Sequence, residues 1–180
     1  PLIKNCINQG FDAIEYINGN LDLASVDEPL LAAKFESLPV QHTVEAWLAL
    51  IPKAIDLLSP LSPLQLRDFL LETSMRHAKT GEVIFEKGAA GSSVFAVFSG
   101  GIKILIETGE DVLEIPMSAG QMFGEVGLIS GRPRGSTVVS SESTILLEIP
   151  RTALLKLMFS QERIKNYVDD LVATRMFSQV

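Results

Sequence analysis

FGEVGLISGRPRGSTV, residues 123–138, is the most informative segment of this 180-residue sequence. A strand is predicted to end at Phe123, because Gly124 permits a tight turn that a side chain would block. Residues 125–129 can then form about one helical turn, whose first N–H groups lack partners inside the helix. Such free donors, together with the helix dipole, favour binding of an anion.

Two opposite charges, Glu125 and Arg134, lie within this segment. Pro133 restrains the backbone just before Arg134, and Gly135 lets the chain approach whatever Arg134 holds. A guanidinium can hold a phosphate, whereas a carboxylate can accept a hydrogen bond from a hydroxyl. The pattern therefore predicts a ligand in which a phosphate and a sugar hydroxyl lie close together.

Short strands separated by glycine-containing turns surround this segment. From Ser74 onward, runs rich in Val, Ile, Phe and Thr replace the helical period, and the expected strands are 82–86, 93–99, 101–108, 111–117, 136–141 and 144–149. Many short strands at nearly even spacing favour a compact antiparallel β-barrel or sandwich.

Helical periodicity is found on both sides of the strand region. Helices are expected over residues 3–17, 27–35, 43–58 and 63–71, and again over 151–159 and 161–177. The order of helices, barrel and helices predicts an α+β fold.

The composition excludes several classes of protein. With 47% hydrophobic and 21% charged residues, the chain is globular rather than disordered. The longest unbroken apolar stretch, residues 46–51, is too short to span a bilayer. A net charge of −7 argues against binding to a nucleic-acid backbone. The single Cys6 and the lack of an apolar leader predict a cytoplasmic location, with neither a membrane nor a nucleic-acid partner.

Residues for metal binding or catalysis are sparse in the sequence. His42 and His77, the two histidines, lie far apart without other ligands at metal-binding spacing. No Gly-x-Ser-x-Gly motif occurs, and Cys6 has no histidine nearby. GAAGSS, residues 88–93, lacks the lysine of a phosphate loop and predicts a hairpin turn. We therefore expect no metal, no cofactor and no catalysis in this chain, although a longer parent protein can still be an enzyme.

The segment 123–138 resembles the phosphate-binding cassette of cyclic nucleotide-binding domains, the family of catabolite activator protein and of the protein kinase A regulatory subunit. The family pattern is roughly F-G-E-x-[AG]-L, a short spacer, and P-R-x-[AS]-[TS]-V. GEVIFEKGAAGSSVFAVFSGGIKI, residues 81–104, resembles the family's opening barrel strands, with Gly81, Gly88 and Gly100 at characteristic glycines. The resemblance covers about residues 57–176. It implies an antiparallel β-barrel (jelly roll) of about eight strands between N-terminal helices and two C-terminal helices.

The resemblance also implies a role for each cassette residue. Glu125 matches the residue that binds the ribose 2′-hydroxyl, and Arg134 matches the residue that binds the exocyclic phosphate. Three further positions usually support the phosphate or its loop, and here they are Gly124, Val126 and Ser136.

The choice of base and the covering of the site are further implications of the resemblance. Gly135 stands where members that prefer cGMP often have a threonine, so cAMP is expected to be favoured over cGMP. In the family, the helices after the barrel close over the base. The residues that would form this lid here are Tyr167, Leu171 and Arg175.

The expected organisation has two parts. Residues 1–41 form a helical extension or the remnant of a preceding domain. Residues 42–180 form the cyclic nucleotide-binding domain, with helices over 43–72, the barrel over 74–150, the cassette over 123–138 and C-terminal helices over 151–180. The expected function is that of a regulatory module that senses a cyclic nucleotide and relays its binding by movement of the C-terminal helices.

Alternatives to this interpretation remain open from the sequence. The barrel can be a ligand-free interaction domain in which Glu125 and Arg134 form an internal salt bridge. IKNCINQGFDAIEYING, residues 3–19, weakly resembles the closing helix of thioredoxin-reductase-like flavoproteins. The barrel would then be the regulatory part of a larger flavin-dependent oxidoreductase. A homodimer through the C-terminal helix is a further alternative, because its apolar stripe suits either core packing or a dimer seam.

Overall fold

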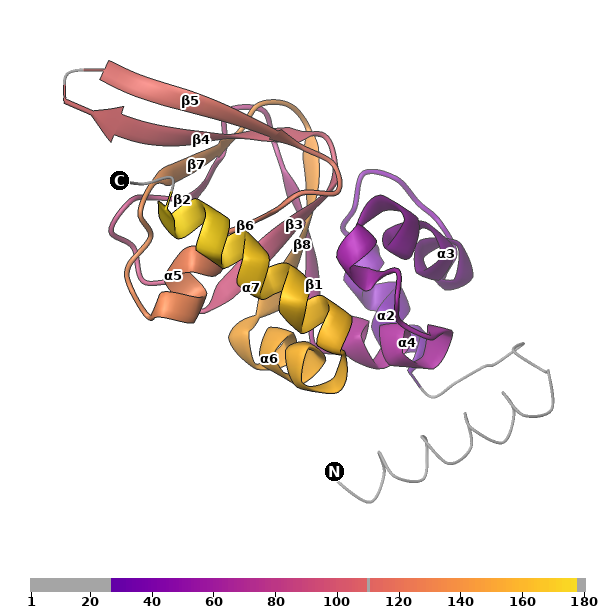
Figure 1. The fold of residues 1–180 in the computed structure, drawn as a ribbon. Coiled ribbons are helices and arrows are strands. Elements are labelled where there is room, and N and C mark those ends of the chain that lie inside the picture. The colour runs from indigo at the N-terminus through magenta and orange to yellow at the C-terminus, as the bar shows by residue number, and fades with distance from the viewer. Residues whose placement is uncertain (1–26, 110, 178–180) are drawn as a thin grey trace.

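Two antiparallel sheets form the centre of the computed structural model, which describes residues 27–109 and 111–177. Each sheet has four strands, in the orders β1-β8-β3-β6 and β2-β7-β4-β5 (Figure 1). The strands are β1 Ser74–Ala78, β2 Val83–Phe85, β3 Ser93–Ser99, β4 Gly101–Thr108, β5 Asp111–Ser118, β6 Met122–Phe123, β7 Thr137–Ser140 and β8 Thr144–Pro150. Eight strands flanked by helices confirm the α+β fold expected from the sequence.

Helices lie before, within and after the run of strands. They are α2 Glu28–Phe35, α3 Val44–Ala54, the 3-10 helix η1 Asp56–Leu58, α4 Pro63–Leu71, α5 Glu125–Ser130, α6 Arg151–Ser160 and α7 Glu162–Phe177. The two expected C-terminal helices are confirmed as α6 and α7. The helix expected over residues 3–17 lies outside the described residues.

Local sequence signals account for the ends of the N-terminal helices. The Ser62 hydroxyl accepts a hydrogen bond from the Gln65 N–H at 3.2 Å, and the Gln65 side chain accepts from the Ser62 N–H at 3.0 Å. This capping box starts α4 at the expected residue. The single helix expected over residues 43–58 is instead divided into α3 and η1. Pro52 removes one helical donor in the last turn of α3, and Ile55 then adopts an extended conformation.

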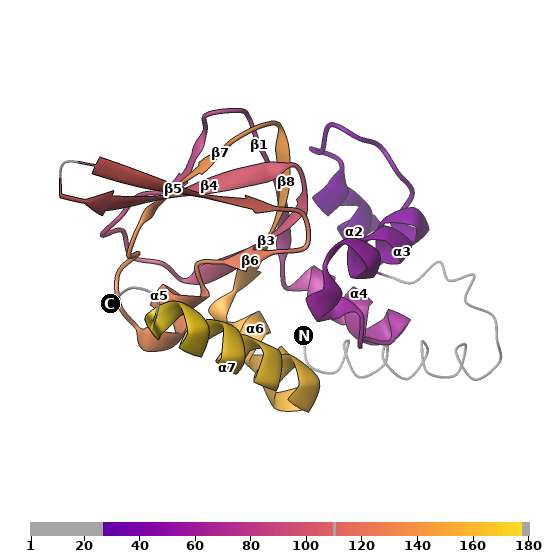
Figure 2. The ribbon, with the colours of Figure 1, turned by 45° about the horizontal axis from the view of Figure 1, so that its top comes forward.

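The core consists of two apolar clusters that meet at β3. Phe95 and Val97 point into the barrel, whereas Val94 and Ala96 face the helices, so β3 is buried on both faces. The helical cluster includes Trp47, and the centroid of its ring system lies 5.2 Å from that of Phe35 and 5.2 Å from that of Phe98. Figures 1 and 2 both show α2–α4 at one end of the barrel and α7 running beside α5 and α6. The α7 helix is thereby placed next to the cassette.

Candidate functional site

The cassette begins with a left-handed turn at Gly124. This glycine joins β6 to α5 and has a φ of +84°, a conformation that L side chains rarely adopt. A Cβ at this position would also lie 2.7 Å from Nη1 of Arg134. Both the turn and the approach of Arg134 therefore require glycine here, which agrees with the tight turn expected from the sequence.

Glu125, the first residue of α5, has a side chain that is almost completely buried, with 1% of its surface exposed. Its Oε1 accepts a hydrogen bond from Nη1 of Arg175 at 2.7 Å. Its Oε2 is buried and has no hydrogen-bond partner among the described residues. A buried carboxylate oxygen without a partner is costly, so this atom offers a strong acceptor to an incoming donor.

Arg134 lies on the loop between α5 and β7 and is 5% exposed. Its Nη1 donates to the carbonyl of Gly124 at 2.7 Å, and its Nη2 donates to the carbonyl of Ser93 at 2.6 Å. The guanidinium carbon lies 4.2 Å from the centroid of the Phe85 ring, a favourable cation–π distance. Its Nε is buried without a hydrogen-bond partner among the described residues.

The charge of Arg134 is held in a largely desolvated environment. Burial lowers the pKa of its guanidinium, and the negative charges of Glu148 and Glu125 act in the opposite direction. An arginine nevertheless keeps its proton in proteins. The site therefore presents a fixed positive charge beside a buried carboxylate.

Glu125 and Arg134 do not form the internal salt bridge that the sequence left open. The ion-pair partner of Glu125 is Arg175, and the guanidinium of Arg134 bonds two main-chain carbonyls. Each of the two residues is therefore held independently, and each retains one buried polar atom without a hydrogen-bond partner in the described part of the chain.

The other predicted cassette residues lie around these two side chains. Gly135 is exposed and is not among the glycines at positive φ, so its backbone can accept a side chain. Val126 and Ser136 are half-buried. Arg132, two residues before Arg134, is exposed and belongs to the solvated side of the loop.

The three predicted lid residues differ in their contacts. Arg175 is half-buried and its Nη1 donates both to Glu125 and to the carbonyl of Met122, each at 2.7 Å. Leu171 is half-buried against the helical cluster, and Tyr167 is 41% exposed. The structure thus brings Arg175 to the cassette, whereas a role for Tyr167 and Leu171 over a base stays a prediction.

An apolar face on the β4–β5 hairpin was missed by the sequence reasoning. Ile102 and Met117 pair across the hairpin and point into the barrel core. Because side chains two residues apart share a face of a strand, the next pairs continue this inner face toward the tip of the hairpin. Those pairs are Ile104 with Ile115 and Ile106 with Leu113, and Leu113 and Ile115 are exposed. The signal for them was the alternating isoleucines of β4.

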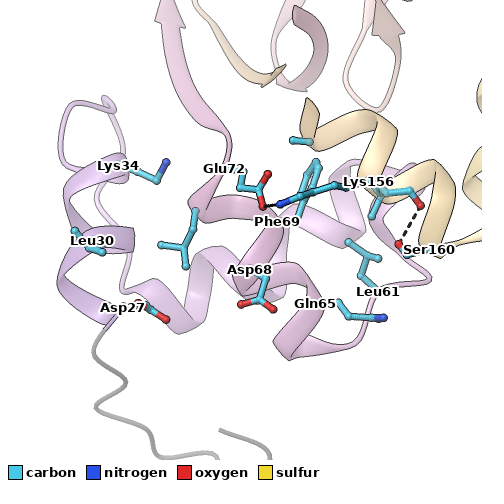
Figure 3. A pocket seen from close by; sticks show the side chains of 13 residues that line it. Asp27, Leu30, Lys34, Leu61, Gln65, Asp68, Phe69, Glu72, Lys156 and Ser160 are labelled. Atoms are coloured by element: carbon cyan, nitrogen blue, oxygen red, sulfur yellow. Dashed lines mark hydrogen bonds and ion pairs between the residues drawn. The ribbon is translucent and has the colours of Figure 1, made fainter. Parts of the chain in front are cut away.

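A separate groove of about 770 Å³ lies between α2, α4 and α6 (Figure 3). Glu72 and Lys156 form an ion pair of 2.5 Å there and join the end of α4 to α6. The lining mixes charged and apolar side chains, including Asp27, Leu30, Lys34, Leu61, Phe69 and Leu157. None of the predicted site residues lines this groove, so it is distinct from the cassette.

The described part of the chain has neither a metal-binding cluster nor a membrane-spanning helix. Within residues 27–109 and 111–177, no group of three His, Cys, Asp or Glu side chains is arranged to hold a metal ion. In the same part of the chain, no helix combines the length and the apolar character needed to cross a bilayer.

Comparison with known proteins connects this site to a family. Residues 75–161 match the family model of the cyclic nucleotide-binding domain. The chain is 25% identical over 135 residues to the cAMP-dependent protein kinase regulatory subunit of Blastocladiella emersonii, covering 67% of this chain and 34% of that protein. It is 30% identical over 115 residues to a cyclic nucleotide-gated potassium channel of Rhizobium etli, covering 64% of this chain and 31% of the channel. The chain thus spans about a third of the length of these curated relatives.

Solved structures with the same fold include two proteins from distant organisms. The regulatory domain of Toxoplasma gondii protein kinase A with cAMP has a TM-score of 0.60 at 19% identity, covering 74% of this chain and 49% of that chain. The Thermus thermophilus catabolite activator protein has a TM-score of 0.59 at 25% identity, covering 68% of this chain and 59% of that chain. With its barrel, its cassette and these matches, residues 75–161 form a cyclic nucleotide-binding domain, similar to those of catabolite activator protein and of the regulatory subunits of protein kinase A.

Proposed function

We propose that this domain binds a 3′,5′-cyclic nucleotide and acts as a regulatory rather than a catalytic unit. The observation that carries the proposal is a pair of buried cassette atoms that have no hydrogen-bond partner among residues 27–109 and 111–177, namely Oε2 of Glu125 and Nε of Arg134. The carboxylate oxygen would accept a hydrogen bond from the ribose 2′-hydroxyl, and the N–H of Nε would donate to a phosphate oxygen. One ligand with a sugar hydroxyl beside a phosphate would satisfy both.

The base of the nucleotide would contact apolar side chains. Ile104 and Ile115 continue the inner face of the barrel along the β4–β5 hairpin, and Ile115 is 39% exposed. Apolar surface of this kind suits a flat heterocycle, because most small-molecule sites combine an apolar lining with a few polar anchors. The curated relatives support the same ligand class, since one is a cAMP-dependent regulatory subunit and another is a cyclic nucleotide-gated channel.

In this proposal cAMP is preferred over cGMP. Gly135 directly follows Arg134 and is exposed, so it has no side-chain hydroxyl to offer to the guanine edge. A site without that donor and acceptor gains nothing from the exocyclic groups that distinguish guanine from adenine.

The proposed relay runs through α7. Arg175 of α7 bonds the carboxylate that would hold the ribose, so ligand contact and helix position share one residue, Glu125. Binding would shift α7 between a state docked on the cassette and an undocked state only if the ligand has different affinities for these two states. Hydrogen exchange of the α7 amides, with and without ligand, would report that shift.

Isothermal titration of the full chain with cAMP and with cGMP tests the proposed function. Saturable binding of both nucleotides, with cAMP at least as tight as cGMP, is the expected result. Saturable cGMP binding tenfold tighter than cAMP binding would contradict the base preference alone. Absence of heat for either nucleotide, confirmed by an unchanged unfolding midpoint, would contradict the proposal as a whole.

A ligand-free interaction domain is the second candidate function, and one observation favours it. Nη1 and Nη2 of Arg134 already donate to main-chain carbonyls, and Oε1 of Glu125 is already paired with Arg175. Much of the cassette is therefore satisfied within the chain. The same titrations decide between the candidates.

Membership of a larger flavin-dependent oxidoreductase concerns residues 3–19, which lie outside the described residues, and stays a prediction. Dimerisation through α7 likewise stays a prediction, which light scattering would test.

A further inference from the structure

Gly91 lies directly against the guanidinium of Arg134, the arginine that the proposed function uses. A Cβ built at position 91 would approach Cζ, Nε and Nη2 of Arg134 to 2.5 Å or less, where ordinary Cβ contacts begin at 3.4 Å. The backbone at Gly91 does not need glycine, because it is not among the positions with positive φ. What position 91 requires is therefore space for the guanidinium, and not an unusual conformation.

The 88–93 loop, which contains Gly91, also holds Arg134 through the main chain. The N–H of Gly88 donates to the Arg134 carbonyl at 2.8 Å, and the N–H of Arg134 donates to the Ala89 carbonyl at 2.9 Å. Ser93, which ends this segment and begins β3, accepts at its main-chain carbonyl from Nη2 of Arg134 at 2.6 Å. Both the backbone and the tip of Arg134 are thus positioned by this loop.

We propose that Gly91 is a positioning residue for the ligand site, because its missing side chain leaves the space in which the Arg134 guanidinium is held against Phe85 and the Ser93 carbonyl. This inference rests on the proposed cyclic nucleotide function for its effect on binding, but the steric contact itself does not depend on a ligand.

A methyl group at position 91 would move the guanidinium rather than the backbone. The three atoms that it would meet are the far end of a flexible side chain, so the least costly response is a rotation of Arg134. The nearest of these atoms, Cζ, would lie at 2.3 Å, so restoring an ordinary contact of 3.4 Å needs a shift of about 1.1 Å (3.4 − 2.3). Binding groups must be held to within about 0.5 Å of their productive geometry, so this shift is large enough to disrupt phosphate binding.

The first experiment measures binding in four proteins by titration with cAMP. They are the full wild-type chain, Gly91→Ala, Arg134→Ala and the double variant. We expect Gly91→Ala to weaken cAMP binding by roughly 10- to 100-fold, as expected when hydrogen bonds to a charged group are lost. In the Arg134→Ala background, adding Gly91→Ala should change the affinity less than twofold. An equal loss in both backgrounds, or full affinity in Gly91→Ala, would overturn the inference.

A matched control is Gly101→Ala, because Gly101 lies at the opposite end of β3 from Gly91, where β4 begins. Gly101 also lacks a positive φ, and its Cβ would meet side-chain atoms of Ser141 and Glu142 at 3.0 and 3.1 Å and the main-chain carbonyl of Met117 at 3.3 Å. This variant tests whether any added methyl on the barrel lowers affinity, and it should bind cAMP as tightly as wild type. A loss as large as that of Gly91→Ala would remove the case for a specific effect on Arg134.

The second experiment needs no ligand and separates this inference from the proposed function. In thermal unfolding, Gly91→Ala should lower the midpoint of the otherwise wild-type chain by roughly 2–8 °C, since the buried guanidinium loses its carbonyl partners. In the Arg134→Ala background the same change should leave the midpoint equal or slightly raised, because the clash is gone and alanine restricts the unfolded chain. If wild type binds no nucleotide, this comparison still tests whether a side chain at position 91 would clash with Arg134. Equal destabilisation in both backgrounds would show that position 91 clashes with something else.

Discussion

The carboxylate of Glu125 and the guanidinium of Arg175 lie 2.7 Å apart, although 50 residues separate them in the chain. Glu125 is the first residue of α5, and Arg175 lies near the end of α7. The same Nη1 of Arg175 also donates to the carbonyl of Met122, just before the cassette. This pair therefore attaches the last helix to the residue that would hold the ribose.

Replacement of Arg175 by alanine tests how strongly this contact holds α7. We expect Arg175→Ala to lower the free energy of unfolding by about 1–3 kcal/mol, because the buried Glu125 carboxylate loses its charged partner. Urea unfolding without ligand measures the change. Arg163→Ala removes an exposed arginine from the same helix and is the control. Equal effects of the two variants would show that the pair contributes no more than a surface charge.

Replacement of the two cassette arginines should have unequal effects on binding. Arg134→Ala is expected to weaken cAMP binding by roughly 10- to 100-fold, because a charge-assisted phosphate contact is lost. Arg132 is exposed, so Arg132→Ala should change the affinity by less than about threefold, as is usual for a screened surface charge. Titration calorimetry gives both values. Similar losses would mean that Arg134 is not the phosphate ligand.

Replacement of Glu125 by glutamine should alter the recognition of the sugar. The carboxylate accepts a hydrogen bond more strongly than the amide oxygen does, so Glu125→Gln should reduce the preference for cAMP over 2′-deoxy-cAMP. The ratio of the two dissociation constants is the measured quantity. A wild-type protein that binds both nucleotides equally well would assign Glu125 a structural role, namely its pair with Arg175.

Installation of a threonine at position 135 should shift the base preference toward cGMP. The hydroxyl would add about one hydrogen bond to guanine, roughly 0.5–1.5 kcal/mol in relative affinity. Gly135 is exposed and does not have a positive φ, so the fold should tolerate Gly135→Thr. Thermal unfolding of the unliganded variant checks this tolerance. A stable variant whose ratio of cAMP to cGMP affinity is unchanged would place base selection elsewhere.

Local signals were enough to predict most elements of the fold. The 93–99 and 101–108 strands have the expected bounds, because the first is rich in Val and Phe, the second is rich in Ile, and a glycine follows each. By contrast, β1 was not among the expected strands. Its sequence, SMRHA, has no β-branched residue, and it becomes a strand by pairing all five of its residues with β8.

The cassette could be recognised from its residues, but its partners could not. Glu125 and Arg134 were identified from their charge and their neighbouring glycines. That Glu125 pairs with Arg175, and that Arg134 donates to the carbonyl of Ser93, are contacts between residues 50 and 41 positions apart. Main-chain carbonyls carry no sequence signature, because every residue has one. The close approach of the Arg134 guanidinium to Gly91 was missed as well, because it joins two segments that are far apart in the chain.

The sequence alone determined the class of the molecule, since hydrophobic period, glycine turns and the spacing of the cassette are local properties that short-range sterics and hydrogen bonding control. Only the tertiary structure decided which atoms of the site are satisfied and which are not. Folding buried Oε2 of Glu125 and Nε of Arg134 without hydrogen-bond partners among the residues that the structure describes. It also brought Arg175 and the 88–93 loop against these two side chains. Such an outcome depends on how distant segments pack, because burial converts an ordinary polar atom into one that strongly favours a ligand.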